Sequence, residues 1–334
     1  CKWFAKKIGF NDSSGGIAAS GGTLSNLNAL IAARNNAGLG SNPNSVLLIS
    51  EDAHSSFIKC IRIMGLDAAN LVRIKTDNQG RMDINNLRKS LNKCLIENKK
   101  IFAIVATLGT TVRGAIDPIK EISEICKERN IWLHIDGSIG GIFALSSIQI
   151  EGLNNINQAN SITINPQKII GITKTSSLLL VANMNTLQKT FSTGLPYISS
   201  KEDIVNRGEI GIQGSRPAEV IKLWLGLRFL GLNGIEDILK SSIKRKDFFI
   251  DHIVKNKFEI YSGPLHIVSF IPKGLTAKDT DFWTHSKVNE LMKNNYMLSR
   301  PKFKGKYYLR VVMGNYNTTD SHIEELLRFL DAYQ

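Results

Sequence analysis

The stretch WLHIDGS at residues 132–138 decides the fold class, together with the stretch NPQK at residues 165–168. Each comes at the end of a short apolar run, so that Asp136 ends one predicted strand and Lys168 follows another. Short, continuous apolar runs are typical of parallel strands, because both faces of a parallel sheet are covered. The two stretches therefore predict a parallel sheet with an acid and a lysine beyond its strand ends.

The first two-thirds of the chain alternates such runs with amphipathic helical patterns. We expect strands at residues 46–50, 71–75, 101–106, 131–135, 161–164 and 177–182. Helices are expected at residues 55–64 and 83–96 and from residue 117 onward. Asp83 is the expected N-cap of the second helix, and Pro118 is expected in the first turn of the third. This alternation predicts an α/β fold in which helices cover a mostly parallel sheet.

The pattern changes after Pro217. Expected elements there are helices at residues 218–230, 235–254, 286–293 and 321–333 and strands at residues 265–271 and 307–313. Helices interleaved with few strands are typical of an α+β unit. The sequence thus predicts a large domain at residues 1–230 and a small C-terminal domain at residues 231–334. Residues 185–214 are the least regular and predict an exposed loop.

Charge and composition argue against several classes of protein. The 334 residues carry a formal net charge of +13, from 42 basic and 29 acidic side chains. Outside a cluster at residues 240–246 the basic residues are scattered, and no zinc-finger or aromatic RNA-binding pattern accompanies them. A solvated basic surface is therefore favoured over a nucleic-acid partner. No apolar run reaches the length of about 18 residues that a membrane span needs, so no membrane partner is expected.

The cysteines and histidines predict a reduced protein without a metal site. The four cysteines, Cys1, Cys60, Cys94 and Cys126, form no C-x-x-C pair. The six histidines show no spacing typical of metal ligands. With no signal-peptide pattern at the start, these features predict a cytoplasmic protein. The chain opens at Cys1 and not at methionine, so we expect that preceding residues are absent.

An aspartate beyond one strand and a lysine beyond another form the pair that a pyridoxal phosphate (PLP) enzyme needs. The lysine forms a Schiff base with the cofactor aldehyde, and the acid keeps the pyridine nitrogen protonated so that the ring accepts electrons. A buried carboxylate is costly unless it is paired, and burial favours the neutral amine that this chemistry uses. Taken singly, Asp136 is more often a cap or an ion-pair member and Lys168 a surface residue, so the combination carries the prediction.

Three further segments carry groups suited to a bound cofactor. The stretch SGGT at residues 20–23 precedes a helix, where glycines let backbone N–H groups approach a phosphate. The stretch GTT at residues 109–111 follows a buried strand, and open parallel sheets bind ligands beyond their strand ends. His54 offers a flat imidazole, suited to stacking on a ring or to acid–base work. Each of these alone is also explained by an ordinary cap, turn or surface residue.

Taken in order, these segments resemble the group II PLP-dependent amino-acid decarboxylases, which include glutamate, aromatic amino-acid, histidine and cysteine-sulfinate decarboxylases. The resemblance runs from Trp3 to the C-terminal end. The motifs that carry it lie at residues 20–26, 50–54, 106–111, 132–141, 165–168 and 214–216, the last leading to KLW at residues 222–224. The resemblance implies the fold of the PLP-dependent transferases, which is aspartate aminotransferase-like (fold type I).

The resemblance also implies roles for individual residues. Lys168 would form the Schiff base, Asp136 would pair with the pyridine nitrogen, and His54 would stack on the ring. The implied cofactor contacts are Gly22, Thr23, Thr111, Ser138, Asn165 and Gln167, with Ser215 reaching the phosphate bound in the partner subunit. Arg310 would hold the α-carboxylate of the substrate. Tyr197, in the irregular segment, is the candidate for the residue that protonates Cα.

The chain departs from the family pattern at three places. Gln167 stands where the family usually has histidine, and an amide can bind a phosphate but cannot relay a proton near neutral pH. Gly137-Ser138 replaces the usual pair of alanines, which changes the floor beneath the ring and adds a hydroxyl. The N-terminal segment of the family, which helps to form the dimer and the substrate pocket, is expected to be missing.

The implied function is decarboxylation of an L-amino acid to the corresponding amine and CO₂, in a homodimer with the active site at the subunit interface. Two alternatives stay open: the first depends on the protonating residue, and the second on the change to Gln167 and the expected absence of the N-terminal segment. One is another outcome of the same PLP chemistry, such as oxidative deamination or aldol-type cleavage. The other is a catalytically silent binding protein. Acidic, aromatic and basic amino acids all stay open as substrates, since Arg310 would bind only the α-carboxylate, which all of them have.

Overall fold

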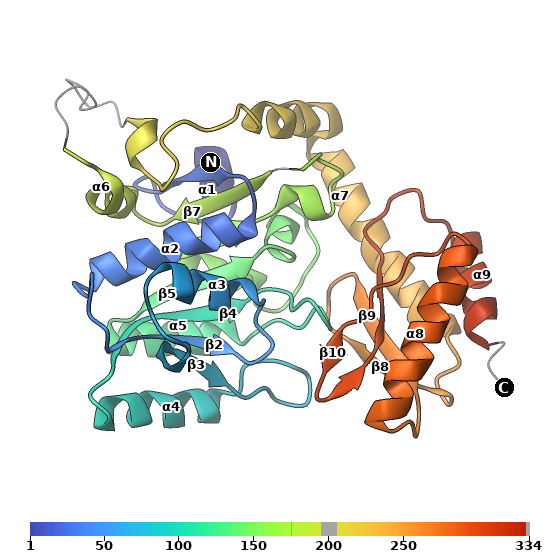
Figure 1. Cartoon of the computed structure of the whole chain (residues 1–334). Coiled ribbons are helices and arrows are strands. Elements are labelled where there is room, and N and C mark those ends of the chain that lie inside the picture. Colours follow the sequence, from blue (N-terminus) through green and yellow to red (C-terminus); the bar gives the residue numbers. More distant parts are fainter. Residues whose placement is uncertain (175, 195–205, 332–334) are drawn as a thin grey trace.

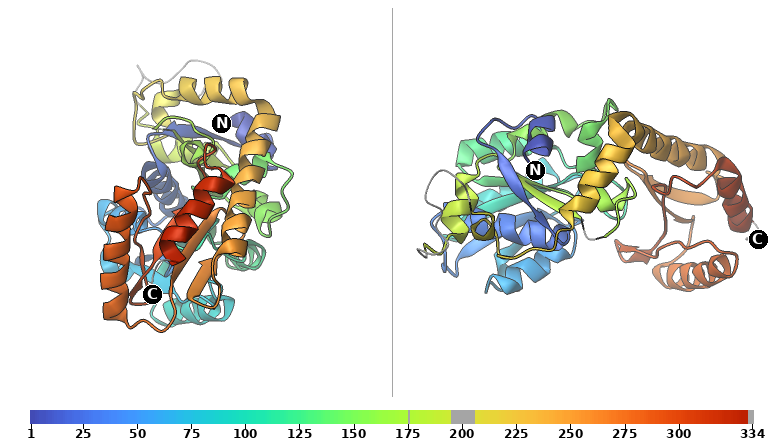
Figure 2. Two further views of the ribbon diagram at one scale, coloured as in Figure 1. Left: turned by 90° about the vertical axis from the view of Figure 1, so that its right-hand side faces the viewer. Right: turned by 90° about the horizontal axis from the view of Figure 1, so that it is seen from above.

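The computed structural model describes residues 1–174, 176–194 and 206–331. A large sheet flanked by helices forms one part of the molecule, and a smaller group of strands and helices forms the other (Figure 1). Figure 2 shows the smaller group beside the large sheet, with the long helix α7 leading from one part to the other. Helix α7 spans Val220–His252.

The large sheet has the strand order β1-β7-β6-β5-β4-β2-β3. Its strands are β1 Gly15–Ala19, β2 Ser45–Ser50, β3 Leu71–Ile74, β4 Lys100–Thr107, β5 Trp132–Gly137, β6 Ser161–Ile164 and β7 Ser177–Val181. The ladders from β3 through β2, β4 and β5 to β6 are parallel, whereas β7 is antiparallel to both β6 and β1. The predicted mostly parallel sheet is confirmed. Strand β1 was not predicted, because its glycines and alanines have low strand propensity.

Helices cover both faces of this sheet. They are α1 Lys2–Lys7, α2 Gly22–Asn36, α3 Ser56–Ile63, α4 Ile84–Ile96, α5 Ile119–Arg129 and α6 Asn185–Phe191. Helices α2 and α3 pack on one face, and α4 and α5 pack on the other. Asp83 caps α4 as predicted, with its carboxylate accepting the Asn86 N–H at 2.7 Å. Pro118 is the N-cap of α5 and therefore lies just before the first turn in which it was predicted.

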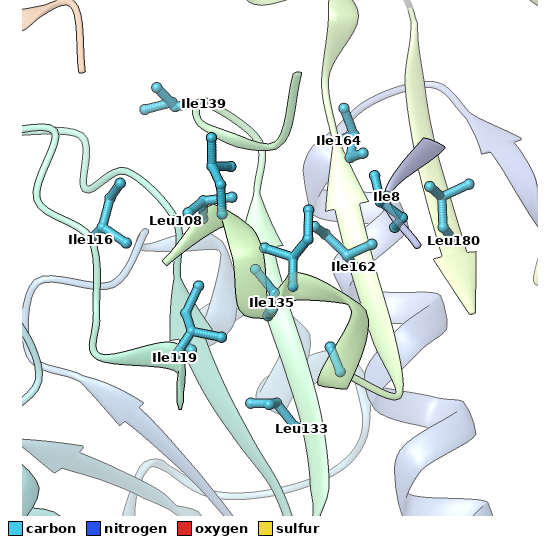
Figure 3. Close-up of a cluster of buried hydrophobic side chains, with 14 of the residues drawn as sticks. Ile8, Leu108, Ile116, Ile119, Leu133, Ile135, Ile139, Ile162, Ile164 and Leu180 are labelled. Carbon is cyan, nitrogen blue, oxygen red and sulfur yellow. The ribbon is translucent and has the colours of Figure 1, made fainter. Parts of the chain in front are cut away.

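Side chains of the central strand β5 alternate between the two faces of the sheet. Leu133 and Ile135 belong to the core under α4 and α5, which Figure 3 shows in part. Trp132 belongs to the core under α2 and α3. His134 and Asp136 share the parity of Trp132, so strand geometry turns both of them toward α2.

The smaller part has its own sheet and core. Its remaining elements are β8 Phe258–Ser262, β9 Ile267–Pro272, α8 Ala277–Lys293, β10 Lys302–Phe303, β11 Lys306–Tyr307, β12 Leu309–Val312 and α9 Asp320–Asp331. Strands β12, β9 and β8 form an antiparallel sheet, and β10 and β11 form a hairpin. Ile235 and Leu239 of α7 pack in the core of the large sheet, whereas Phe249 of α7 packs in the second core. The helix predicted at residues 286–293 begins earlier, at a Thr276 N-cap.

The basic cluster at residues 240–246 lies on α7 and is engaged within the chain. Lys240 pairs with Glu236 at 2.6 Å, and Arg245 donates to the Met313 carbonyl at 3.1 Å. In the part of the chain that the structure describes, no helix combines the length and apolar character needed to cross a membrane.

Gly231 interrupts α7 with a φ of 63°, and a Cβ added there would meet no atom within 4 Å. Gly231→Ala should lower the free energy of unfolding by about 1–3 kcal/mol, because a positive φ combined with a ψ of 179° is a region that essentially only glycine adopts. Gly234 has helical dihedrals and room for a Cβ, with Leu230 at 3.4 Å. Gly234→Ala should therefore raise the free energy of unfolding by about 1 kcal/mol. Urea unfolding measures the free energy of unfolding of both variants. A change of the same sign in both variants would contradict the break in α7.

Candidate active site

A cavity of about 180 Å³ opens beyond the carboxyl ends of β4, β5 and β6. Its walls are formed by Gly22, Thr23, Asn26, His54, Ser56, Thr107, Gly109, Thr111, Asp136, Ser138, Ile139, Asn165 and Lys168. Helix α2 begins at this edge of the sheet and directs its N-terminus toward the cavity. Open parallel sheets bind their ligands at this edge, so the position is that of a cofactor or substrate site.

Eight residues predicted from the sequence line this cavity: Gly22, Thr23, His54, Thr111, Asp136, Ser138, Asn165 and Lys168. Gln167 is not on its wall, because its Oε1 accepts the Ser176 N–H at 2.5 Å. Ser215 is exposed and also lies off the wall. Tyr197 lies outside the described residues.

Three polar residues of the wall were not predicted as site residues. Asn26 stands in a motif that was recognised, but its contact with the aspartate depends on how α2 crosses the sheet. Ser56 and Thr107 are 2% and 3% exposed, and their hydroxyls have no hydrogen-bond partner among the described residues. Buried hydroxyls are normally paired, so both are available to a ligand in the cavity.

The Asp136 carboxylate is buried at the end of β5 and is held through both oxygens. Oδ1 accepts the Ser138 N–H at 3.1 Å, and Oδ2 accepts the Asn26 amide at 3.2 Å. Each carboxylate oxygen can accept more than one hydrogen bond, so Asp136 retains capacity for a protonated ring nitrogen. A cationic N–H would also compensate the cost of burying this charge.

Lys168 ends the 3₁₀ turn Pro166–Lys168 that follows β6. Its side chain is exposed in the single chain and lines the open cavity, so the burial expected from the sequence is only partial. Burial lowers the pKa of the Lys168 amine, and the charge of Arg310 lowers it further, while Asp136 acts in the opposite direction. A lowered pKa increases the neutral fraction of the amine, which is the nucleophilic form.

His54 lies at the mouth of the cavity, and its Nδ1 accepts the Ser56 N–H at 3.1 Å. Partial burial lowers the pKa of His54, and Lys168 and Lys59 lower it further, while Asp136 raises it. The Asp136 charge acts on both His54 and Lys168, so these side chains share part of their electrostatic environment. A mainly neutral imidazole is the form suited to stacking against a cationic ring.

The N-terminus of α2 forms a cradle for an anion. A Cβ at Gly22 would lie 2.8 Å from both Asn165 Nδ2 and Ser138 Oγ, so the glycine leaves the space between these groups open. Asn165 Oδ1 accepts the Ser177 hydroxyl at 2.5 Å, which turns the amide N–H groups toward Gly22. The unpaired N–H groups and dipole of a helix start favour a phosphate. The residues present therefore fit PLP, since the cavity wall offers a carboxylate acceptor for the ring nitrogen and donors for the phosphate.

Arg310 reaches this region from β12 of the smaller part. Its Nε donates to Ser299 Oγ at 2.8 Å, and its Nη1 donates to the Thr111 carbonyl. Guanidinium has five N–H donors, so three are left for a ligand. Arg310 is not on the cavity wall, but Thr111 is, so this contact holds Arg310 next to the wall.

A second contact ties the smaller part to the loop that carries His54. Arg113 and Asp52 form an ion pair at 2.7 Å, with their side chains 2% and 7% exposed. The Arg113 guanidinium lies 4.2 Å from the ring centroid of Phe303 in the β10–β11 hairpin. Removing one member of a buried pair leaves an uncompensated charge, so the contact constrains the loop before His54 strongly.

A seven-stranded, mostly parallel sheet with a lysine and a buried aspartate beyond neighbouring strands defines a PLP-binding enzyme of fold type I. Residues 2–271 match the model of the pyridoxal-dependent decarboxylase conserved domain. The chain therefore belongs to the pyridoxal-dependent decarboxylases, which are carboxy-lyases that use PLP.

Individual relatives agree with this family. An aromatic-L-amino-acid decarboxylase of Bacillus atrophaeus is 31% identical, over 99% of this chain and 71% of that protein. The acidic amino acid decarboxylase GADL1 of Mus musculus is 28% identical, over 95% of this chain and 62% of that protein. The crystal structure of mouse CSAD has a TM-score of 0.91 at 25% identity, over 99% of this chain and 73% of that one. The chain thus spans between 62% and 73% of the length of these three proteins.

Proposed function

We propose that this chain decarboxylates an L-amino acid to the corresponding amine, with Lys168 as the residue that attaches PLP. The observation that carries the proposal is the convergence of Lys168, Asp136 and the Gly22 cradle on one cavity. When bound, PLP supplies an electron sink for the carbon that loses CO₂. The relatives are named for aromatic and for acidic amino acids, so the side chain of the substrate stays open.

Different residues of the cavity would bind different parts of the cofactor. The N–H groups at the start of α2, the Thr23 hydroxyl and the Asn165 amide would hold the phosphate. Asp136 would keep the ring nitrogen protonated, and His54 would cover one face of the ring. The unpaired hydroxyls of Ser56 and Thr107 are the remaining donors for polar groups of the cofactor.

Arg310 would bind the substrate α-carboxylate through the N–H groups that Ser299 and Thr111 leave unused. Binding there would orient the amino acid relative to Lys168. The proton that replaces CO₂ requires an acid near Cα, and Tyr197 stays the prediction for that role.

A homodimer is proposed from the surface around α7. Its exposed apolar side chains are Trp3, Ile212, Val220, Ile221, Trp224, Leu225, Phe229 and Leu232. Beside them lies an apolar groove of about 530 Å³, between the N-terminal residues and α7. Large apolar patches mark interfaces, and aromatic side chains are enriched in interface cores. The exposed Ser215 just precedes α7, which supports its predicted contact with the phosphate in the partner subunit.

Two broader assignments are also proposed. The two hydrophobic cores support a large and a small domain, and the break at Gly231 lies at the predicted boundary between residues 1–230 and 231–334. Ile235 and Leu239 lie beyond that boundary but pack in the first core. In the described part of the chain all four cysteines are unpaired, which supports a cytoplasmic location.

The central test is release of CO₂ from a panel of acidic, aromatic and basic L-amino acids in the presence of PLP. Lys168→Ala should reduce the rate by at least about a thousandfold, because the attachment residue is lost. Lys174→Ala, at an exposed position six residues later, should retain activity. An aldehyde product would favour oxidative deamination, and no turnover of any amino acid would favour a silent binding protein.

Arg310→Gln should raise the KM for the amino acid about tenfold or more, because a charge-assisted hydrogen bond contributes about 1.5–3 kcal/mol. Arg310→Lys should recover part of this loss, since it keeps the charge but not the paired donors. Steady-state kinetics on the best substrate of the panel measures both. A KM unchanged in Arg310→Gln would contradict a carboxylate-binding role.

Analytical ultracentrifugation tests the dimer. The full chain should sediment as a dimer at micromolar concentration, and Phe229→Glu should weaken association because Phe229 is 90% exposed in the single chain. A matched change outside the surface, Phe282→Glu on α8, should leave association unchanged. A wild-type chain that stays monomeric across the concentration range would contradict the proposed interface.

A further inference from the structure

We propose that His134, acting through Asn26, is a positioning residue for the Asp136 carboxylate. The inference rests on the proposed function, in which Asp136 pairs with the ring nitrogen of PLP. His134 does not line the cavity, and no role has been given to it so far. It lies on β5 two residues before Asp136, so the two side chains share one face of the strand.

Four hydrogen bonds join the core beneath α2 to the carboxylate. Trp132 Nε1 donates to Ser161 Oγ at 2.8 Å, and Ser161 Oγ lies 2.8 Å from His134 Nδ1. His134 Nε2 lies 3.1 Å from Asn26 Oδ1, and Asn26 Nδ2 donates to Asp136 Oδ2 at 3.2 Å. The side chains of this hydrogen-bonded chain come from β5, β6 and α2, and it ends at the cavity wall.

The chemistry of the groups fixes the direction of every bond. A carboxylate only accepts, so Asn26 must present its NH₂ group to Asp136 and its carbonyl oxygen to His134. His134 must then carry a proton on Nε2. Burial lowers the pKa of His134 well below its ordinary value, so the ring is neutral and Nδ1 is an acceptor. Ser161 donates to that Nδ1, and its oxygen accepts the Trp132 indole, which can only donate.

Burial makes this arrangement selective. His134, Asn26 and Ser161 are each 0% exposed, so no bulk water replaces a lost bond. If the Asn26 amide rotated by half a turn, its oxygen would face the Asp136 carboxylate and its NH₂ group would face the His134 N–H. Each buried mismatch of this kind is costly. The Nε2 proton of His134 therefore selects the single amide orientation that binds Asp136.

The position of Asn26 links this chain to the phosphate cradle. Asn26 lies four residues after Gly22, so both residues are on the same side of α2. The start of the helix would hold the phosphate, and its next turn holds the carboxylate that faces the ring nitrogen. His134 thus sets the register of Asp136 relative to the opposite end of the cofactor.

The first experiment observes His134 directly, in full-length apoprotein labelled with ¹⁵N-histidine. Between pH 8 and pH 5.5 its Nε2 should give the signal of a protonated nitrogen and its Nδ1 that of an unprotonated one. Assignment follows from the loss of these signals in His134→Gln. A ring that titrates in this range, or one that carries its proton on Nδ1, would overturn the proposal.

The second experiment measures the Kd of PLP by quenching of tryptophan fluorescence, together with the Tm of each apoprotein. His134→Leu should raise the Kd about tenfold, as loss of a residue that orients a ligand group commonly does. His134→Gln should recover most of this loss, because its amide can donate to Asn26. Leu133→Ala is the control, since Leu133 is buried on the opposite face of β5 and its truncation lowers the Tm. It should change the Kd by no more than about twofold.

The outcomes separate positioning from general destabilisation. A Kd unchanged in His134→Leu would overturn the proposal, and so would an equal rise in Leu133→Ala at the same loss of Tm. A wild-type chain that does not bind PLP would instead refute the proposed function, because the ¹⁵N signals of His134 are measured without the cofactor.

Discussion

The parallel pairing of β4, β5 and β6 is the constraint on which the site depends. The register places Thr107 opposite Asp136 and Asp136 opposite Thr163, so the three strands end at the same level. Parallel strands bring their carboxyl ends to one edge, whereas antiparallel strands would send alternate ends to opposite edges. The turn after β6 therefore delivers Lys168 to the edge at which β5 delivers Asp136, and α2 starts beside them.

The smaller part of the chain completes this edge. Arg310 joins β12 to the Thr111 carbonyl, and Arg113 joins the His54 loop to the β10–β11 hairpin. Both contacts are made by arginine, whose fixed charge and several donors suit partly buried junctions. The cavity is consequently bounded by loops whose positions depend on both cores, although the lysine and aspartate belong to the large sheet alone.

Much of this arrangement could be predicted from the sequence because it depends on local pattern. The buried strand at residues 101–106 is a continuous apolar run, and the family motifs are short and ordered along the chain. Strand β1 was missed because it is rich in glycine and alanine. Strand β8 was also missed, although its alternation of apolar and polar residues is typical of a half-buried strand. The antiparallel direction of β7 was also not predictable, since an apolar run does not show in which direction the strand crosses the sheet.

Contacts between distant segments were harder to predict. His134 and Asn26 are 108 residues apart, and nothing local to either shows that they meet. The placement of Gln167 illustrates the same limit: its neighbours in sequence line the cavity, but its amide binds the Ser176 backbone. Ser56 and Thr107 became candidates only when their buried hydroxyls proved to have no partner among the described residues.

The central claim is that PLP is attached at Lys168. Incubation of the full-length protein with PLP, reduction with borohydride and mass mapping of the digested peptides tests it most directly, because reduction makes the linkage permanent. We predict that the reduced cofactor is found on the peptide that contains Lys168 and that it is absent from Lys168→Ala. Attachment at another lysine, or equal labelling of Lys168→Ala, would contradict the account.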